Sequence, residues 1–224
     1  MIRYQSKLDT IKGDYIMNQT FSETLQTLNE RRSVRHYDAS FTLTETDVKE
    51  LIELTTAAPS AWNLQHWHFI AFHSEEAKQQ LAPIAYNQPA ITSSSVVIAV
   101  LGDTQANRNY NPVYGPAVEA GGMTEELFDS IKGQVEGAYQ SAAYGRDAAM
   151  SNASLAAMQL MLVAEAKGLS TLAMGGFDHQ VFADTFITEE RFVPVMLIAV
   201  GKAVEDAKKR PALRLPVEQV TTIL

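Results

Sequence analysis

The spacing of apolar residues predicts an amphipathic helix near the start of the chain. Phe21, Leu25 and Leu28 recur at i, i+4 and i+7, which places them on one helical face. Thr20 and Glu23 have the spacing of a capping box, so we expect the helix to begin there. A basic segment follows its far end.

A second helix is predicted by the same kind of pattern. Thr42 and Glu45 form a capping box, and Val48 and Leu51 follow at helical spacing. This helix has to end before Pro59, because the residue that precedes a proline is disfavoured in the α region. We therefore expect a loop around the proline.

Runs of apolar, β-branched and aromatic residues predict strands in the rest of the chain. These runs lie at 67–72, 96–101, 169–174 and 192–200. Helical patterns are found at 74–81, 124–144 and 146–167. The middle of the last helix, at 155–162, is apolar nearly all round, which indicates burial on most sides. A subunit interface would explain that burial, and so would a purely internal core position.

The segment at 102–122 is polar and rich in turn-forming residues, with two prolines and four glycines. We expect it to be poorly ordered. Segments of this composition form the lids of some active sites, although most of them are only loops.

Composition and charge limit the kinds of protein that the chain can be. We expect a flexible leader over 1–17 and a single domain over 18–224 of the 224 residues. A net charge of −8 argues against a general nucleic-acid binder, and the apolar runs are too short to span a membrane. The start of the chain lacks a secretory signal and the chain lacks cysteine, so the cytoplasm is the default compartment.

The basic segment at 31–38 is the first candidate for chemistry. Arg31, Arg32 and Arg35 crowd into five positions of an otherwise acidic chain. Guanidinium groups bind phosphate through charge-assisted and often bidentate hydrogen bonds. A solvated helix end is the alternative, because cations are favoured near the C-terminal end of a helix dipole. The segment alone does not decide between the two.

Two further segments could line a ligand. Asn63 and Gln65 stand just before a predicted strand, where amide groups can contact a bound molecule. Gly175 and Gly176 follow another strand, and their small size lets a ligand approach backbone N–H groups. In both places an ordinary turn is the alternative.

Four motifs of the chain are RRSVRHYD at 31–38, APSAWNLQHW at 58–67, GLSTLAMGGFD at 168–178 and RLP at 214–216. In order and spacing they together resemble the FMN-dependent nitroreductase family, in particular its small bacterial NAD(P)H nitroreductases. The resemblance implies an α+β fold of three layers, in which helices flank a mixed central β-sheet. It also implies an intertwined homodimer with FMN at the interface and with the C-terminal segment reaching across to the partner.

The resemblance implies a role for particular residues around FMN. Its phosphate and ribityl chain would be held by Arg31, Arg32, Ser33 and Arg214. Arg35 would lie near the pyrimidine edge of the flavin and stabilise the negative charge of the reduced ring.

Other implied contacts come from loops. The partner subunit would contribute Pro59, Ser60 and Ala61, and Asn63 would help to build the same edge. Gln88, in preference to Asn87, would contact the polar rim of the flavin ring. The N–H groups of Gly175 and Gly176 would face the flavin atoms N5 and O4. No side chain has to be a nucleophile or a metal ligand, because FMN carries the redox step.

The implied function is that of an FMN-dependent NAD(P)H oxidoreductase with ping-pong turnover. NADH or NADPH would reduce the flavin at N5, and a flat, electron-poor acceptor such as a nitroaromatic or a quinone would then be reduced in the same pocket. One alternative is the same fold with another redox task, such as enoate-type reduction or flavin turnover. Another is a flavin-binding protein with little turnover.

Overall fold

The computed structural model describes residues 19–205, 207 and 213–224, and the leader expected over 1–17 lies outside them. The chain divides into two units, 1–31 and 32–224. In the first unit the described structure is helix α1 (Gln19–Glu30). The predicted amphipathic helix is therefore present, but Thr20 lies inside it and is not its N-cap.

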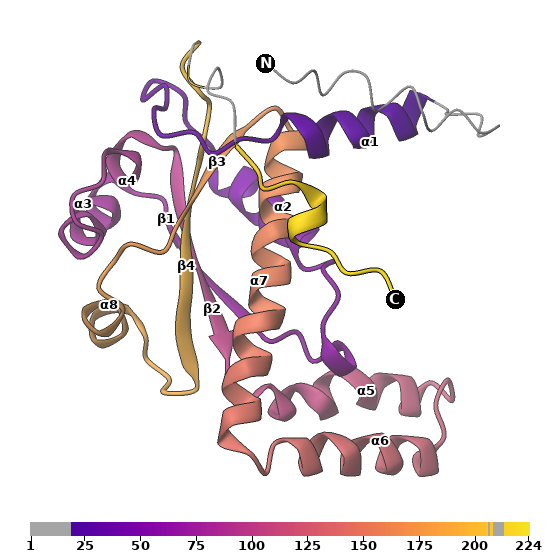
Figure 1. The fold of residues 1–224 in the computed structure, drawn as a ribbon. Helices are drawn as coiled ribbons and strands as arrows, with labels where there is room; N and C mark the ends of the chain where they lie inside the picture. The colour runs from indigo at the N-terminus through magenta and orange to yellow at the C-terminus, as the bar shows by residue number, and fades with distance from the viewer. Residues whose placement is uncertain (1–18, 206, 208–212) are drawn as a thin grey trace. The chain divides into compact units, whose positions relative to one another are not determined.

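The second unit is built on a four-stranded sheet of strand order β1-β2-β4-β3 (Figure 1). The strands are β1 (Trp67–Phe72), β2 (Val96–Asp103), β3 (Ser170–Met174) and β4 (Phe192–Gly201), close to their predicted positions. All three strand pairs are antiparallel. In the described part of the chain, the parallel pairing expected of a mixed sheet is confined to an isolated bridge between Ser33 and Thr171.

Helices cover both faces of this sheet, so the predicted three-layer α+β architecture is confirmed (Figure 1). One face is covered by α3 (Glu75–Ile84), α4 (Pro89–Ser93) and α8 (His179–Phe186). The other is covered by α2 (Glu45–Thr55) and α7 (Ala142–Ala166). Side chains of β2 alternate between the two cores, because successive residues of a strand point to opposite faces.

The expectation of a poorly ordered segment at 102–122 is wrong. After β2, the short helix η4 (Ala106–Asn109) leads into α5 (Tyr110–Glu119), and α6 (Glu125–Ala138) packs beside α5 in a helical hairpin (Figure 1). Proline is tolerated in the first turn of a helix, where the N–H group has no intrahelical acceptor, and Pro112 occupies that turn of α5. Tyr110 is buried and its ring packs on Phe128 of α6, so tertiary contacts outweigh the weak helix propensity of the segment.

Two predicted helix boundaries also need correction. The capping box of α2 is formed by Thr44 and Asp47, two residues after the predicted pair. The helix predicted over 124–144 ends at Ala138, and α7 begins after Ser141, whose hydroxyl accepts a hydrogen bond from the N–H of Tyr144. Past β4, the C-terminal segment contains the short helix η5 (Val217–Gln219).

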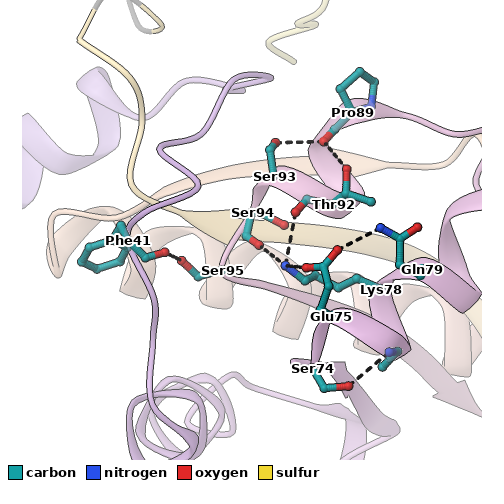
Figure 2. Close-up of polar contacts among 11 residues, drawn as sticks. Phe41, Ser74, Glu75, Lys78, Gln79, Pro89, Thr92, Ser93, Ser94 and Ser95 are labelled. Carbon is teal, nitrogen blue, oxygen red and sulfur yellow. Dashed lines mark hydrogen bonds and ion pairs between the residues drawn. The ribbon is translucent and has the colours of Figure 1, made fainter.

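Lys78 is a buried cation of α3 that binds carbonyl groups at the end of α4 (Figure 2). Its Nζ donates to the carbonyl oxygens of Thr92 and Ser94, at 3.2 and 3.0 Å, and pairs with the carboxylate of Glu75 at 3.2 Å. The last carbonyl groups of a helix lack intrahelical donors, and a lysine there satisfies them. Gln88, a predicted site residue, is the N-cap at the other end of the same helix.

In the ranges that the structure describes, no helix is both long enough and apolar enough to cross a membrane.

Candidate functional site

Backbone hydrogen bonds fix residues 34–38 of the basic segment beside the sheet. The N–H of Val34 donates to the carbonyl of Thr171 in β3, at 2.9 Å. The N–H of Asp38 donates to the carbonyl of Lys202, just past β4, also at 2.9 Å. Tyr37 forms an antiparallel bridge with Ala203. The segment therefore extends from the edge strand β3 to the end of β4.

Buried and exposed side chains are separated along this segment. Val34 and Tyr37 are 0% and 5% exposed and belong to the hydrophobic core. The Tyr37 hydroxyl donates to the carbonyl of Ala199, and burial raises the pKa of that hydroxyl. Ser33 and Arg35 are exposed. A hydroxyl and a guanidinium of the predicted site are thus presented to solvent by a rigid backbone.

The other predicted phosphate ligands lie on separate segments. Arg31 directly follows α1 in the first unit, and its N–H donates to the carbonyl of Thr27. Arg32 is half-buried at the start of the second unit. Arg214 is exposed in the C-terminal segment, and its guanidinium donates to the neighbouring carbonyl of Leu213. The roles of these three arginines at a phosphate stay predictions.

The loop before β1 contains the short helix η3 (Ala61–Asn63) and has an unusual backbone. Trp62, Asn63 and Gln65 have positive φ angles of 46°, 48° and 53°. Residues with a Cβ atom rarely adopt this left-handed conformation, and such strain is found preferentially at functional sites. The predicted flavin contacts of this loop are exposed or half-buried, and they are Pro59, Ser60, Ala61 and Asn63.

One pair of predicted site residues is joined directly. The Nε2 atom of Gln88 donates to the carbonyl of Gly176 at 2.7 Å and to the carbonyl of Ala85 at 3.1 Å. Gly175 and Gly176 are exposed just after β3. A Cβ atom added at Gly175 would meet no other group within 4 Å. A flat molecule can therefore approach this backbone closely, next to an amide that is held in place.

A cavity of about 590 Å³ lies between the strained loop and α5. Its lining residues carry amide, aromatic and aliphatic side chains, without a formal charge, and they are Asn63, Gln65, Trp67, Asn109, Pro112 and Val113. Sequence reasoning named Asn63 as a site residue but did not single out Asn109 of η4 or Pro112 and Val113 of α5. All three lie in the segment at 102–122, which we interpreted as poorly ordered and whose composition is found in lids as well as in ordinary loops.

A buried histidine lies close to this loop. His66 is fully buried, and among the described residues neither of its ring nitrogens has a hydrogen-bond partner. Its ring stacks on that of Tyr139, at 6.4 Å between centroids. Burial lowers the pKa of His66 from its ordinary value of 6.5 to about 4, so the imidazole is neutral in the folded protein at neutral pH.

Comparison with known proteins assigns the chain to a family. The sequence profile of the nitroreductase family matches residues 28–202. The chain therefore belongs to the nitroreductase family. YodC of Bacillus subtilis, which is named as an NAD(P)H nitroreductase, is 50% identical over 203 residues, covering 91% of this chain and 100% of YodC.

Two further relatives extend the comparison. A nitroreductase-type protein of Exiguobacterium sibiricum, solved in complex with FMN, is 37% identical with a TM-score of 0.83, covering 90% of this chain and 97% of its own. The CLA biosynthesis enone reductase of Lactiplantibacillus plantarum is 33% identical, covering 87% of this chain and 92% of the enzyme. The same family thus includes proteins named for different redox reactions.

The buried imidazole predicts a specific acid sensitivity. Since the folded pKa of His66 lies below its unfolded value, the unfolded state takes up a proton that the folded state excludes. This contribution to stability is fully present above pH 6.5 and is lost as the pH falls toward about 4. In that window the protonation of His66 lowers the free energy of unfolding by up to about 1.4 kcal/mol for each pH unit. We expect His66→Gln to abolish this part of the pH dependence. Urea unfolding of both proteins between pH 8 and 4 measures it, and parallel curves would contradict it.

Proposed function

We propose that the protein is an FMN-dependent NAD(P)H oxidoreductase that reduces nitroaromatics, quinones or similar flat, electron-poor acceptors. Support comes from membership of the nitroreductase family, from the NAD(P)H nitroreductase name of YodC and from the FMN complex of the Exiguobacterium relative. In this chain, the observation that carries the proposal is the exposed backbone of Gly175 and Gly176 beside the fixed amide of Gln88.

The described residues fit FMN in both shape and charge. The open space at Gly175 admits a flat ring against backbone N–H groups. Ser33 pairs with Thr171 in β3. Gly175, which directly follows β3, lies four residues after Thr171. Four residues of extended chain span about 13 Å. That separation leaves room for a ribityl chain between a ring at the glycines and a phosphate near Ser33.

The roles of the basic residues follow from charge. The chemistry that FMN supplies when bound is the acceptance of hydride from NADH or NADPH at N5 and its transfer to the acceptor. Arg35 is proposed to lie at the pyrimidine edge and to stabilise negative charge on the ring. Arg31, Arg32 and Arg214 are proposed to bind the phosphate with Ser33.

Loop residues complete the proposed site. Pro59, Ser60 and Ala61 would reach the FMN of the partner subunit, and Asn63 would join them at the ring edge. The cavity next to Asn63 has an uncharged lining, which suits a neutral, flat acceptor. Enoate-type reduction is the second candidate function, because a relative at 33% identity is named as an enone reductase.

We propose that the protein works in the cytoplasm, where NADH and NADPH are available, and that residues 18–224 act as one FMN-binding domain. Recovery of the protein from the membrane or extracellular fraction of cells would contradict the first part. FMN binding by a chain that starts after residue 31 would contradict the second, because that chain lacks Arg31.

A homodimer is proposed because apolar side chains are left exposed on two elements. On α7, Leu155 and Met158 are 47% and 38% exposed, one turn apart on the same face. In the C-terminal segment, Leu213 and Ile223 are 90% and 92% exposed. A second subunit would cover both sets. We expect a dimer in sedimentation at micromolar concentration and a monomer for Leu155→Asp with Met158→Asp. Monomeric wild-type protein would contradict the proposal.

The phosphate site makes a further prediction. Replacing Arg31 and Arg214 together by alanine removes two charge-assisted hydrogen bonds, each worth about 1.5–3 kcal/mol. We expect the affinity for FMN, measured by flavin fluorescence titration, to fall by at least about a hundredfold.

The matched control also removes two positive charges, those of two lysines that form ion pairs with glutamates of α2. Lys49 pairs with Glu45, and Lys167 pairs with Glu50. Lys49→Ala with Lys167→Ala is expected to retain FMN as the wild type does. Full flavin occupancy of the arginine double variant after extensive dialysis would refute the proposed phosphate site.

A further inference from the structure

The strained loop before β1 is held by side chains that come from other elements. Three left-handed residues, Trp62, Asn63 and Gln65, occur within four positions. A backbone of this kind persists only where its surroundings over-determine it. Besides local backbone hydrogen bonds, the backbone of residues 61–65 makes hydrogen bonds with side chains, and three of these side chains belong to other elements of the fold.

Two of these hydrogen bonds reach the loop from η4 and α5. The Tyr114 hydroxyl donates to the carbonyl of Trp62 at 2.9 Å. The Asn109 amide donates to the carbonyl of Leu64 at 2.8 Å. Leu64 is fully buried in a small core that the helical hairpin builds around Tyr110. The loop thus contacts the helical hairpin and η4 through the buried side chain of Leu64 and through two hydrogen bonds.

A third hydrogen bond comes from α7. The N–H of Ala61 donates to the Oδ1 atom of Asn152 at 2.8 Å. Asn152 is 7% exposed, and its own amide nitrogen donates to the carbonyl of Ala148, one turn earlier, at 2.7 Å. That second bond fixes the orientation of the amide, so that its oxygen faces the loop. Within the loop, the N–H of Gln65 donates to the hydroxyl of Ser60 at 2.9 Å.

We propose that Tyr114, Asn109 and Asn152 are positioning residues that hold residues 60–65 in the conformation that binds the flavin. The proposal rests on the proposed function, in which Ser60, Ala61 and Asn63 contact FMN. Without these bonds, the left-handed residues relax toward the ordinary right-handed region. FMN binding then has to reorder the loop, and affinity falls because preorganisation is lost.

The same contacts connect the flavin loop to the acceptor. Asn109 holds the loop and also lines the cavity that Asn63 lines from the other side. A loosened loop therefore alters the cavity wall together with the flavin contacts. We expect the KM for the acceptor to rise in a variant that lacks one of the hydrogen bonds from Tyr114, Asn109 or Asn152 to the loop.

The chain offers a matched pair of variants that separates positioning from stability. Tyr114→Phe removes only the hydroxyl that binds the loop. Tyr110→Phe removes a hydroxyl of the same helix that donates to the carbonyl of Phe128 at 2.7 Å, inside the helical hairpin. Each loses one hydroxyl-to-carbonyl hydrogen bond, so both are expected to unfold at slightly lower temperature.

The test is a fluorescence titration of wild type and both variants with FMN, followed by visible circular dichroism of the bound flavin. We expect Tyr114→Phe to bind FMN about fivefold more weakly, the effect of one net hydrogen bond, and to change the dichroism of the flavin. Tyr110→Phe is expected to match the wild type in both measurements. Asn109→Ala, compared with Asn107→Ala in the same short helix η4, is expected to give the same ranking.

The outcomes distinguish the two proposals. Wild-type protein that does not bind FMN overturns both the proposed function and the positioning role. Wild-type protein that binds FMN, with equal affinity and dichroism in the two tyrosine variants and in the two asparagine variants, overturns the positioning role alone. A selective loss in Tyr114→Phe and Asn109→Ala supports it.

Discussion

The burial of β2 on both faces is the constraint on which the rest of the second unit depends. All eight residues of this strand are buried. A strand with no exposed face has to pair with a neighbour on each side and be covered by helices above and below. Its pairing with β1 and β4, and the two helical layers, satisfy that requirement. Polar groups are then left to the sheet edge and to the loops at strand ends.

The candidate site is assembled from those remaining places. Ser33 and Arg35 stand on the segment that pairs with the edge strand β3, and Gly175 follows the last residue of that strand. Gln88, at the N-terminus of α4, donates a hydrogen bond to Gly176. Lys78 of α3 binds the other end of α4 through the carbonyl of Ser94. The scaffold is thus rigid where the site needs fixed donors. The loop before β1 is strained, and side chains from three other elements, η4, α5 and α7, form hydrogen bonds with its backbone.

Local patterns predicted the parts of the fold that local physics determines. The four strands were predictable because their segments are rich in apolar, β-branched and aromatic residues, most clearly in β2 and β4. The capping box of α2 was misplaced by two residues because Thr42 with Glu45 and Thr44 with Asp47 both fit the pattern. Helix α5 was missed because contacts such as Tyr110 with Phe128, which are tertiary, outweigh its glycine and prolines.

The candidate site divides in the same way. Motifs in the sequence indicated the arginines, the amide loop and the glycine pair. The hydrogen bond from Gln88 to Gly176 joins residues 88 positions apart, and no spacing rule predicts such a contact. Asn152 gave no signal, because it lies among other polar residues of α7 such as Ser151 and Ser154, and Asn109 lay in a segment taken for a loop. The burial of His66, between two half-buried neighbours, likewise depends on the helical hairpin, whose end carries Tyr139.

The most direct test of the proposed chemistry is a visible absorption spectrum of the purified protein, followed by anaerobic addition of NADH and then of NADPH. We expect flavin absorption bands, or bands that develop when FMN is supplied, and we expect one of the two nucleotides to bleach them rapidly. A protein that stays colourless after FMN is supplied would contradict the cofactor assignment. A yellow protein that neither nucleotide bleaches would contradict the oxidoreductase function and leave a flavin-binding protein.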